Sequence, residues 1–394
     1  MNEQEYNEFK DNFYKWKQNE YKMHPLKALF FEVTLRCNAR CEHCGSSCGD
    51  TIQKDEITKE EIMGVLDDVR ARIGTDPKEV MINITGGEPL VRKDLFEIME
   101  YADKLGFPWG MTTNGMLINK EIVKKMRDTH MYSVSVSLDG LKETHEKFRK
   151  VPNCYEKILN GLKLMLNEPS IKVVQVTTCV NKKNIKELDE LYYLLLGLGI
   201  KYWRIIQVDP IGRARDNDDI LLDSEGIKNM VRFISEKKLE NNMDITYGCG
   251  HYLGPIRDRY VRELPYLCYT GFYIGSVLSN GDIFVCPDVK RRPELIQGNI
   301  RKDSFVDVWE NKFKVFRKMN RTCNEKCKKC EEWKLCGGDA FHTWDFDLNE
   351  PLICSKELFK EDYIFMKEDL KRDKLKAKQF EKKKKNNTNK KTSI

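Results

Sequence analysis

Six strand-like segments alternate with helix-like segments between residues 28 and 208, and this alternation constrains the fold of the chain most. The strand candidates are short, rich in β-branched or aromatic residues and mostly continuous in apolar character, as buried parallel strands are. They are Ala28–Thr34, Glu79–Thr85, Pro108–Thr113, Tyr132–Leu138, Lys172–Thr178 and Tyr202–Val208. The helix candidates between them are Lys59–Ile73, Lys93–Leu105, Lys120–Asp128, Cys154–Leu166 and Asn184–Leu196. Repeated β/α units predict a parallel sheet with right-handed crossovers, and the stretch is shorter than the roughly 250 residues of an eight-unit barrel.

The first strand candidate leads into a loop with three cysteines spaced C-x3-C-x2-C, namely Cys37, Cys41 and Cys44. Three thiolates on one short loop can hold three irons of a [4Fe–4S] cluster and leave the fourth iron open. Electron-carrier clusters normally use four cysteines, so an open iron at a strand end indicates chemistry. The alternative is zinc, which prefers C-x2-C or C-x4-C pairs with a distant second pair and fits this spacing poorly.

The cysteine loop resembles the signature of the radical S-adenosylmethionine (SAM) superfamily, with His43 at a position that is usually aromatic. The resemblance implies a partial six-stranded barrel. It also implies that the open iron chelates SAM and that the reduced cluster cleaves SAM to methionine and a 5′-deoxyadenosyl radical. Cys48 lies outside the triplet, and we interpret it as an ordinary loop cysteine.

Further polar residues follow the other strand candidates, where ligands of such barrels lie. The run Gly86-Gly87-Glu88-Pro89 resembles the family motif that holds the amino group of SAM, although it is also a plausible strand-to-helix turn. Thr113, Ser137 and Asp139 are placed to reach the SAM ribose or carboxylate, and each is equally suited to a helix cap or a turn.

A second group of cysteines lies near the carboxyl end. Cys268 and Cys286 flank a predicted hairpin of Tyr273–Leu278 and Asp282–Val285, where Asn280-Gly281 is a type I′ turn signal. The later cysteines are Cys323, Cys327, Cys330, Cys336 and Cys354. Zinc sites are the alternative here. The arrangement nevertheless resembles the SPASM extension of radical SAM maturases, which carries up to two auxiliary [4Fe–4S] clusters.

That resemblance implies an outer cluster on Cys327, Cys330, Cys336 and Cys354, and an inner cluster on Cys268 and Cys286. The family expects a further cysteine at position 340, where this chain has Ala340. Cys323 is our predicted substitute, with Asp339 and His342 as other candidates. An open iron, or the absence of the inner cluster, also remains possible on the sequence alone.

Charge and hydropathy favour a cytoplasmic protein, because the chain has neither a signal peptide nor an apolar run of membrane-spanning length. Residues 371–394 carry eleven Lys or Arg and two acidic residues, a net charge of +9, which leaves −3 for the rest. We interpret this tail as solvated, because no aromatic residues interleave the lysines as nucleic-acid binding would favour. Fourteen cysteines in such a chain indicate metal or redox ligation rather than disulfides.

The predicted fold class is therefore α/β, a partial (β/α)6 barrel followed by a small cysteine-rich α+β domain. The predicted boundaries are an N-terminal helical extension at 1–27, the barrel at 28–245, the auxiliary-cluster domain at 246–358, and a charged helix and tail at 359–394. An aromatic helical stripe in the extension, Tyr6, Phe9, Phe13, Tyr14 and Trp16, is expected to pack on the barrel.

The resemblance implies an enzyme that abstracts hydrogen from a substrate, and our first hypothesis is a ribosomal peptide or protein that is crosslinked or oxidised. Asp288 is a candidate base, and Cys249 a candidate hydrogen donor; a turn residue and a small buried residue are their alternatives. The second hypothesis is a small-molecule, haem or cofactor precursor, and the third is an iron–sulfur electron-transfer protein. About 27 residues before the first strand are too few for a leader-binding domain, so a peptide substrate implies a separate leader-binding protein. A flavodoxin- or ferredoxin-type electron donor is the other implied partner.

Overall fold

The computed structural model describes residues 3–49, 53–215, 217–248, 250–254, 257–263, 266–318 and 321–359. In these ranges ten strands form one sheet in the order β10-β9-β8-β1-β2-β3-β4-β5-β6-β7. The strands are β1 (Ala28–Glu32), β2 (Met81–Thr85), β3 (Trp109–Thr113), β4 (Ser133–Ser137), β5 (Val173–Val180), β6 (Tyr202–Gln207), β7 (Asp244–Tyr247), β8 (Ile274–Val277), β9 (Asp282–Phe284) and β10 (Gly298–Asn299). A separate pair is formed by β11 (Trp344–Asp345) and β12 (Glu350–Pro351).

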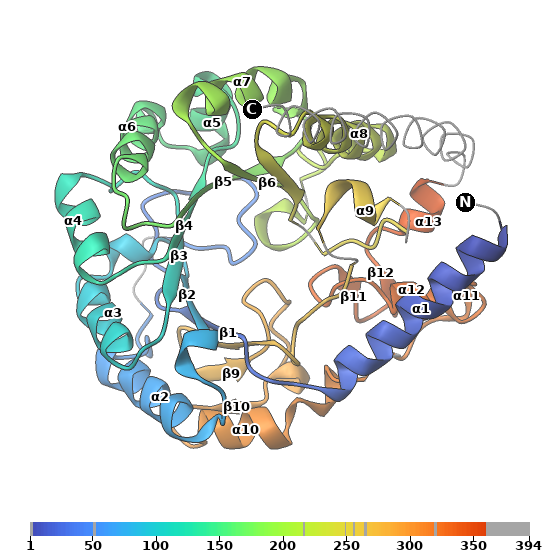
Figure 1. Cartoon of the computed structure of the whole chain (residues 1–394), viewed down its shortest axis with the longest axis horizontal. Coiled ribbons are helices and arrows are strands. Elements are labelled where there is room, and N and C mark those ends of the chain that lie inside the picture. Colours follow the sequence, from blue (N-terminus) through green and yellow to red (C-terminus); the bar gives the residue numbers. More distant parts are fainter. Residues whose placement is uncertain are drawn as a thin grey trace, which may run out of the picture.

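Neighbouring strands from β1 to β7 are parallel, and helices lie outside the curved sheet (Figure 1). The longer helices are α1 (Glu3–Lys22), α2 (Lys59–Arg72), α3 (Leu95–Lys104), α4 (Lys120–Asp128), α5 (Lys142–Arg149), α6 (Cys154–Leu166), α7 (Leu188–Leu198), α8 (Ser224–Glu240) and α10 (Phe305–Asn311). One-turn helices are α9 (Asp258–Val261), α11 (Glu325–Lys328), α12 (Trp333–Cys336) and α13 (Ser355–Leu358). The predicted α/β class with a partial barrel is thus confirmed, and the sheet is open between β10 and β7.

Local sequence signals explain where the outer helices begin. Thr58 forms a capping box with Glu61 at the start of α2, because each side chain bonds the backbone N–H of the other. Asn119 and Asp223 cap α4 and α8 by accepting backbone N–H bonds. All six predicted strands are present, whereas α5 and β7 were absent from our sequence interpretation.

The hairpin of β8 and β9 continues the sheet beyond β1, because β8 pairs with β1 in parallel and with β9 in antiparallel register. Its predicted type I′ turn is wrong. That turn needs positive φ at both central residues, but among these only Gly281 has it (φ +86°). The Gly281 N–H donates to the Leu278 carbonyl at 2.9 Å, and the Leu278 N–H donates to Asp282. These bonds describe a three-residue loop in which Gly281 supplies the left-handed position.

The aromatic stripe had led us to expect that α1 packs on the β/α units. It packs instead against the cysteine-rich region. Phe13 is buried with Tyr252, Tyr266 and Leu335, and Lys17 Nζ donates to the Leu335 carbonyl at 2.5 Å. Figure 1 shows α1 running beside α12. The amino-terminal segment is therefore part of the cover of the second cysteine group.

Candidate active site

The cysteine loop follows β1 and is tied to the β6 side of the barrel. Arg213, in the loop after β6, donates through Nε to the Cys41 carbonyl at 2.8 Å and through Nη1 to the Cys48 carbonyl at 2.9 Å. The Cys37 N–H donates to the Gly49 carbonyl at 2.6 Å, which closes the base of the loop. The loop is thereby fixed from two sides, with Cys41 buried and Cys37 and Cys44 half-buried.

Each of the three loop sulfurs has its own hydrogen-bond donor. Arg149 Nη1 lies 3.5 Å from Cys41 Sγ, and Asn114 Nδ2 lies 4.0 Å from Cys37 Sγ. The Cys48 N–H lies 3.3 Å from Cys44 Sγ. The Cys48 thiol also donates to Cys44 and is the main reason that the pKa of Cys44 falls to about 6. Such donors favour the thiolate, the form of cysteine that ligates metals, although burial dominates at Cys37 and raises its pKa to about 11.

His43 is a packing residue in this structure. Its ring stacks on Phe148 with centroids 4.4 Å apart and planes 4° from parallel. Burial lowers the pKa of His43 to about 3, so the imidazole is neutral. Its Nδ1 is buried without a hydrogen-bond partner among the described residues. A planar ring of any kind could make this contact, which is consistent with the aromatic residue usual at this position.

The two glycines of the Gly86–Pro89 run let the β2 end cross the base of the cysteine loop. A Cβ on Gly86 would lie 2.3 Å from the Thr34 carbonyl oxygen, and one on Gly87 2.2 Å from the Arg36 carbonyl oxygen. The Gly87 and Glu88 N–H groups donate to these same carbonyls at 2.8 and 2.9 Å. Any side chain at either glycine would therefore separate the two loops.

The Glu88 carboxylate connects β2 to β3. It accepts from the Thr113 hydroxyl and the Asn114 N–H, both at 2.7 Å, and from the Leu90 N–H at 3.1 Å. Burial raises its pKa, although these three donors work against that shift. The described contacts of Glu88 and Thr113 are thus structural, and Pro89 starts the short 3-10 helix Pro89–Val91. Their predicted contacts with SAM remain predictions.

Asp139 holds Arg149 against the cysteine loop. Arg149 Nε donates to Asp139 Oδ2 at 2.5 Å, and the Cys179 N–H donates to Oδ1 at 2.8 Å. Burial alone would raise the pKa of Asp139, but its partners, Arg149 first among them, together keep it below its usual range. Ser137 ends β4, half-buried, two residues before Asp139. The sequence indicated Asp139 but not its partner, because α5, which supplies Arg149, was missed.

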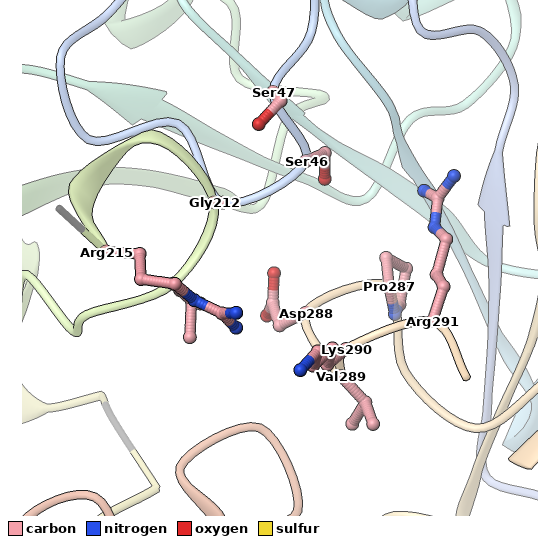
Figure 2. Close-up of a pocket in the computed structure, with 11 residues that line it drawn as sticks. Ser46, Ser47, Gly212, Arg215, Pro287, Asp288, Val289, Lys290 and Arg291 are labelled. Carbon is pink, nitrogen blue, oxygen red and sulfur yellow. The ribbon is translucent and has the colours of Figure 1, made fainter. Parts of the chain in front are cut away.

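A pocket of about 350 Å³ lies beside the cysteine loop, where three distant segments meet (Figure 2). Ser46 and Ser47 form one wall, and the loop after β6 forms another. The third wall is the segment after β9, in which Asp288 points towards Arg215. The lining residues are Gly45, Ser46, Ser47, Ile211, Gly212, Arg215, Pro287, Asp288, Val289, Lys290 and Arg291.

Three cations line this pocket and differ in their partners. Arg291 pairs with Glu32, and Lys290 Nζ lies 3.8 Å from an Asp347 carboxylate oxygen. The Arg215 N–H donates to the Gly212 carbonyl at 3.3 Å, whereas its exposed side chain makes no hydrogen bond or close ion pair within the residues that the structure covers and interacts electrostatically with Asp347. The sequence interpretation missed all three, since lone basic residues in loops carry no pattern. It did identify Asp288, which the fold places in the pocket.

A buried ionic network joins the β6 end to the carboxyl-terminal region. His251 lies 2.8 Å from Asp209 Oδ1 through Nε2 and 2.8 Å from Asp339 Oδ2 through Nδ1. Burial would lower the pKa of His251, but the two carboxylates raise it to about 10. His342 lies farther away, with Nε2 3.9 Å from Asp209 Oδ2. Asp339 is thus paired with His251.

The remaining predicted residues fall in several places. Cys286 follows β9, Cys327 lies in α11, Cys336 ends α12, and Cys354 precedes α13. Cys249 lies outside the described residues. Within the described ranges, no three or more His, Cys, Asp or Glu side chains are grouped closely enough to hold a single metal ion. No described helix is long and apolar enough to span a bilayer.

Comparison with known proteins identifies the family. A model described as the radical SAM superfamily matches residues 31–195, and one described as an iron–sulfur cluster-binding domain, SPASM, matches 268–331. An AdoMet-dependent heme synthase of Methanosarcina barkeri is 30% identical over 79% of this chain and 90% of its own length. The chain belongs to the radical SAM superfamily and carries a SPASM domain.

Other relatives have names that describe different activities. A second Methanosarcina barkeri protein, an Fe-coproporphyrin III synthase, is 29% identical over 79% of this chain and 82% of its own length. The mycofactocin maturase of Mycolicibacterium smegmatis is 25% identical over 79% of this chain and 76% of its own length. Among solved structures, anSMEcpe with bound AdoMet has a TM-score of 0.69 and 20% identity, covering 88% of this chain and all of that one. That likeness shows the shared fold.

Family membership implies a SAM-binding [4Fe–4S] cluster, SAM and auxiliary clusters. The residues present fit the first cluster, because three cysteines share one loop and each sulfur has a donor. Cys37, Cys41 and Cys44 would hold it. When bound, it supplies the electron that cleaves SAM to methionine and the 5′-deoxyadenosyl radical.

Proposed function

We propose that this protein is a radical SAM enzyme whose substrate is an iron tetrapyrrole with carboxylate side chains, a haem or haem precursor. The heme synthase and Fe-coproporphyrin III synthase relatives support this small-molecule substrate better than the peptide that our sequence analysis preferred. The mycofactocin maturase and the PqqA peptide cyclase of Rhizobium meliloti, at 25% and 24% identity, match at lower identity.

The observation that carries the proposal is the pocket between the cysteine loop and the segment after β9. Its cations come from two segments, Arg215 from one and Lys290 and Arg291 from the other. Arginine recognises carboxylates through paired N–H donors, and the exposed Arg215 side chain has no hydrogen bond within the residues that the structure covers, so its N–H groups can make this contact. In the proposal, Arg215 binds one carboxylate and thereby orients the tetrapyrrole edge towards the cysteine loop.

Asp288 is the proposed proton acceptor in this pocket. Its carboxylate is exposed, faces Arg215 and lies 3.9 Å from Cys286 Sγ through Oδ2. Removal of a hydrogen atom from a substrate carbon leaves a radical. If that radical then loses one electron and one proton, the electron needs an acceptor such as an auxiliary cluster, and the proton needs a base.

Anaerobically reconstituted protein should be mixed with SAM, dithionite and Fe-coproporphyrin III, with 5′-deoxyadenosine and the tetrapyrrole mass as the two readouts. We expect substrate-dependent 5′-deoxyadenosine and a mass change in the tetrapyrrole. Uncoupled 5′-deoxyadenosine with an unchanged tetrapyrrole would contradict the proposal and favour the peptide alternative.

The role of Arg215 has a matched control. Loss of a hydrogen bond to a charged group costs about 1.5 kcal/mol, so Arg215→Gln should raise KM for the tetrapyrrole about tenfold. Lys157→Gln removes an exposed cation on the outer helix α6 and should leave KM unchanged. Equal KM values for the two variants would exclude Arg215 as the carboxylate contact.

A further inference from the structure

The second cysteine group divides into two packed sets, and the division differs from the one that spacing predicts. Cys323 and Cys327 are buried together with Trp344, and Trp333 and Phe346 cover them. Cys336 and Cys268 pack instead with Phe13, Tyr252, Tyr266 and Leu335. Cys336 therefore lies with Cys268, although its C-x2-C-x5-C spacing groups it with Cys327 and Cys330.

The short helix α12 separates the two sets. Trp333, its first residue, faces the Cys323 side, and its ring centroid lies 6.2 Å from that of Trp344. Leu335 and Cys336, its last residues, face the Cys268 side. Lys17 from α1 fixes that side by donating to the Leu335 carbonyl at 2.5 Å. Because the two ends of α12 face different cysteine sets, the cysteines that flank this helix are divided between the two sets.

Cys330 and Cys354 join the Cys323 side through α11 and α13. Lys326 in α11 pairs with Glu357 in α13 at 2.9 Å, and Cys354 is the residue that caps α13. Asn324, which caps α11, donates through Nδ2 to Glu350 at 2.8 Å. The Cys327 thiol accordingly interacts electrostatically with three other cysteines, namely Cys323, Cys330 and Cys354.

Electrostatic interactions agree with the packing on the second side of the division. Lys17, buried against Leu335, interacts electrostatically with both Cys336 and Cys268. Cys286 interacts with Cys268 in the same way. Beyond Cys336, two glycines with positive φ, Gly337 and Gly338, turn the chain so that Asp339 reaches His251.

We propose that Cys323, Cys327, Cys330 and Cys354 form the outer cluster site, and that Cys268, Cys286 and Cys336 belong to the inner site. The outer site then has four thiolates, a complete ligand set for a [4Fe–4S] cluster. In this division Cys323 takes the outer position that spacing gives to Cys336. Cys336 in turn takes the inner position that the absent cysteine at 340 would have filled. Cys323 is thus an outer ligand, in contrast to the inner role that spacing suggested.

The test uses full-length protein that also carries Cys37→Ala, Cys41→Ala and Cys44→Ala, so that only auxiliary clusters contribute. After anaerobic reconstitution, iron and sulfide are counted and the reduced protein is examined by EPR. Cys323→Ala and Cys354→Ala should weaken the same EPR signal, and Cys268→Ala and Cys336→Ala should weaken the other. Cys154→Ala, which removes a buried thiol at the start of α6, is the control and should change neither signal.

Double variants distinguish the two divisions without relying on one protein. If Cys323 and Cys354 share a cluster, their double variant should lose no more than the roughly 4 irons of one cubane. The Cys336→Ala/Cys354→Ala double variant should lose about 8 irons, whereas the division by spacing predicts a loss of about 4. Serine versions, compared at equal far-UV circular dichroism, replace any alanine variant that fails to fold. The proposal is overturned if Cys336 variants match Cys354 variants, or if Cys323→Ala leaves iron and EPR unchanged.

Discussion

The two cysteine groups of this chain differ in how their members are brought together. Cys37, Cys41 and Cys44 lie on one loop after β1, so their spacing alone defines a ligand set. The second group spans residues 268 to 354 and is assembled by α1, α11, α12 and α13. Spacing is informative where the chain has no freedom between ligands. Where short helices intervene, packing determines which cysteines meet.

The sharpest test of this contrast removes the local group. The Cys37→Ala/Cys41→Ala/Cys44→Ala variant should produce no 5′-deoxyadenosine from SAM and dithionite, because no thiolate remains to hold the SAM cluster. It should keep about 8 irons, against about 12 in the unmodified protein, if each site holds one cubane. Residual SAM cleavage would contradict the assignment of the first loop, and zinc in place of iron would contradict that of the second group.

Removal of the Arg149–Asp139 pair, which holds the first cysteine loop, should have the next largest effect. Arg149→Met leaves the buried Asp139 carboxylate without its cation, and breaking a buried pair in this way costs about 3–5 kcal/mol. Thermal or denaturant unfolding should show this loss, with poorer iron incorporation at the first site. Lys147→Met, which removes an exposed pair with Glu143 on the same helix, should lower the free energy of unfolding much less. Comparable losses in the two variants would exclude the bracing role.

The sequence predicted most of the barrel because each element carries its own signal. The six strands are short apolar runs, and α2 has a capping box. The β7 strand has only four residues, and α5 carries mainly charged side chains, so neither shows a clear period. Arg149 and His251 escaped notice for a related reason. Their partners, Asp139 and Asp209 among them, are distant in sequence, and no local pattern connects them.

The network at His251 connects the two regions and should make stability depend on pH. Its folded-state pKa of about 10 lies above the ordinary 6.5, so its contribution is complete below about pH 6.5 and is lost as pH rises through 10. The midpoint temperature of thermal unfolding should therefore decrease as the pH is raised from 7 to 10. In His251→Gln this decline should be smaller, since the group that loses its proton is gone. An identical decline in both proteins would assign it to other groups.

The smallest effect is expected from restoring the cysteine that the family has at position 340. Ala340 is 1% exposed, and its N–H donates to the Gly250 carbonyl at 3.1 Å. Even a Cβ on Gly250 would lie 2.4 Å from the Ala340 side chain, so little room exists for a further ligand or for a shift of the backbone. If Cys323 is already an outer ligand, Ala340→Cys should change neither the iron content nor the EPR signals. A mild loss of stability, about 1–3 kcal/mol, is expected from overpacking.

Ala340→Ser is the matched control, because it has nearly the same size and no thiol. If Ala340→Cys alone gained iron or a new EPR signal, the site would have been short of a thiolate in the unmodified protein. The division by spacing would then be correct, and the packing of Cys336 with Cys268 would not reflect ligation. If both variants behave alike, the packing of neighbouring helices determines which cysteines of the second group share a cluster. In the first group, the loop alone determines this.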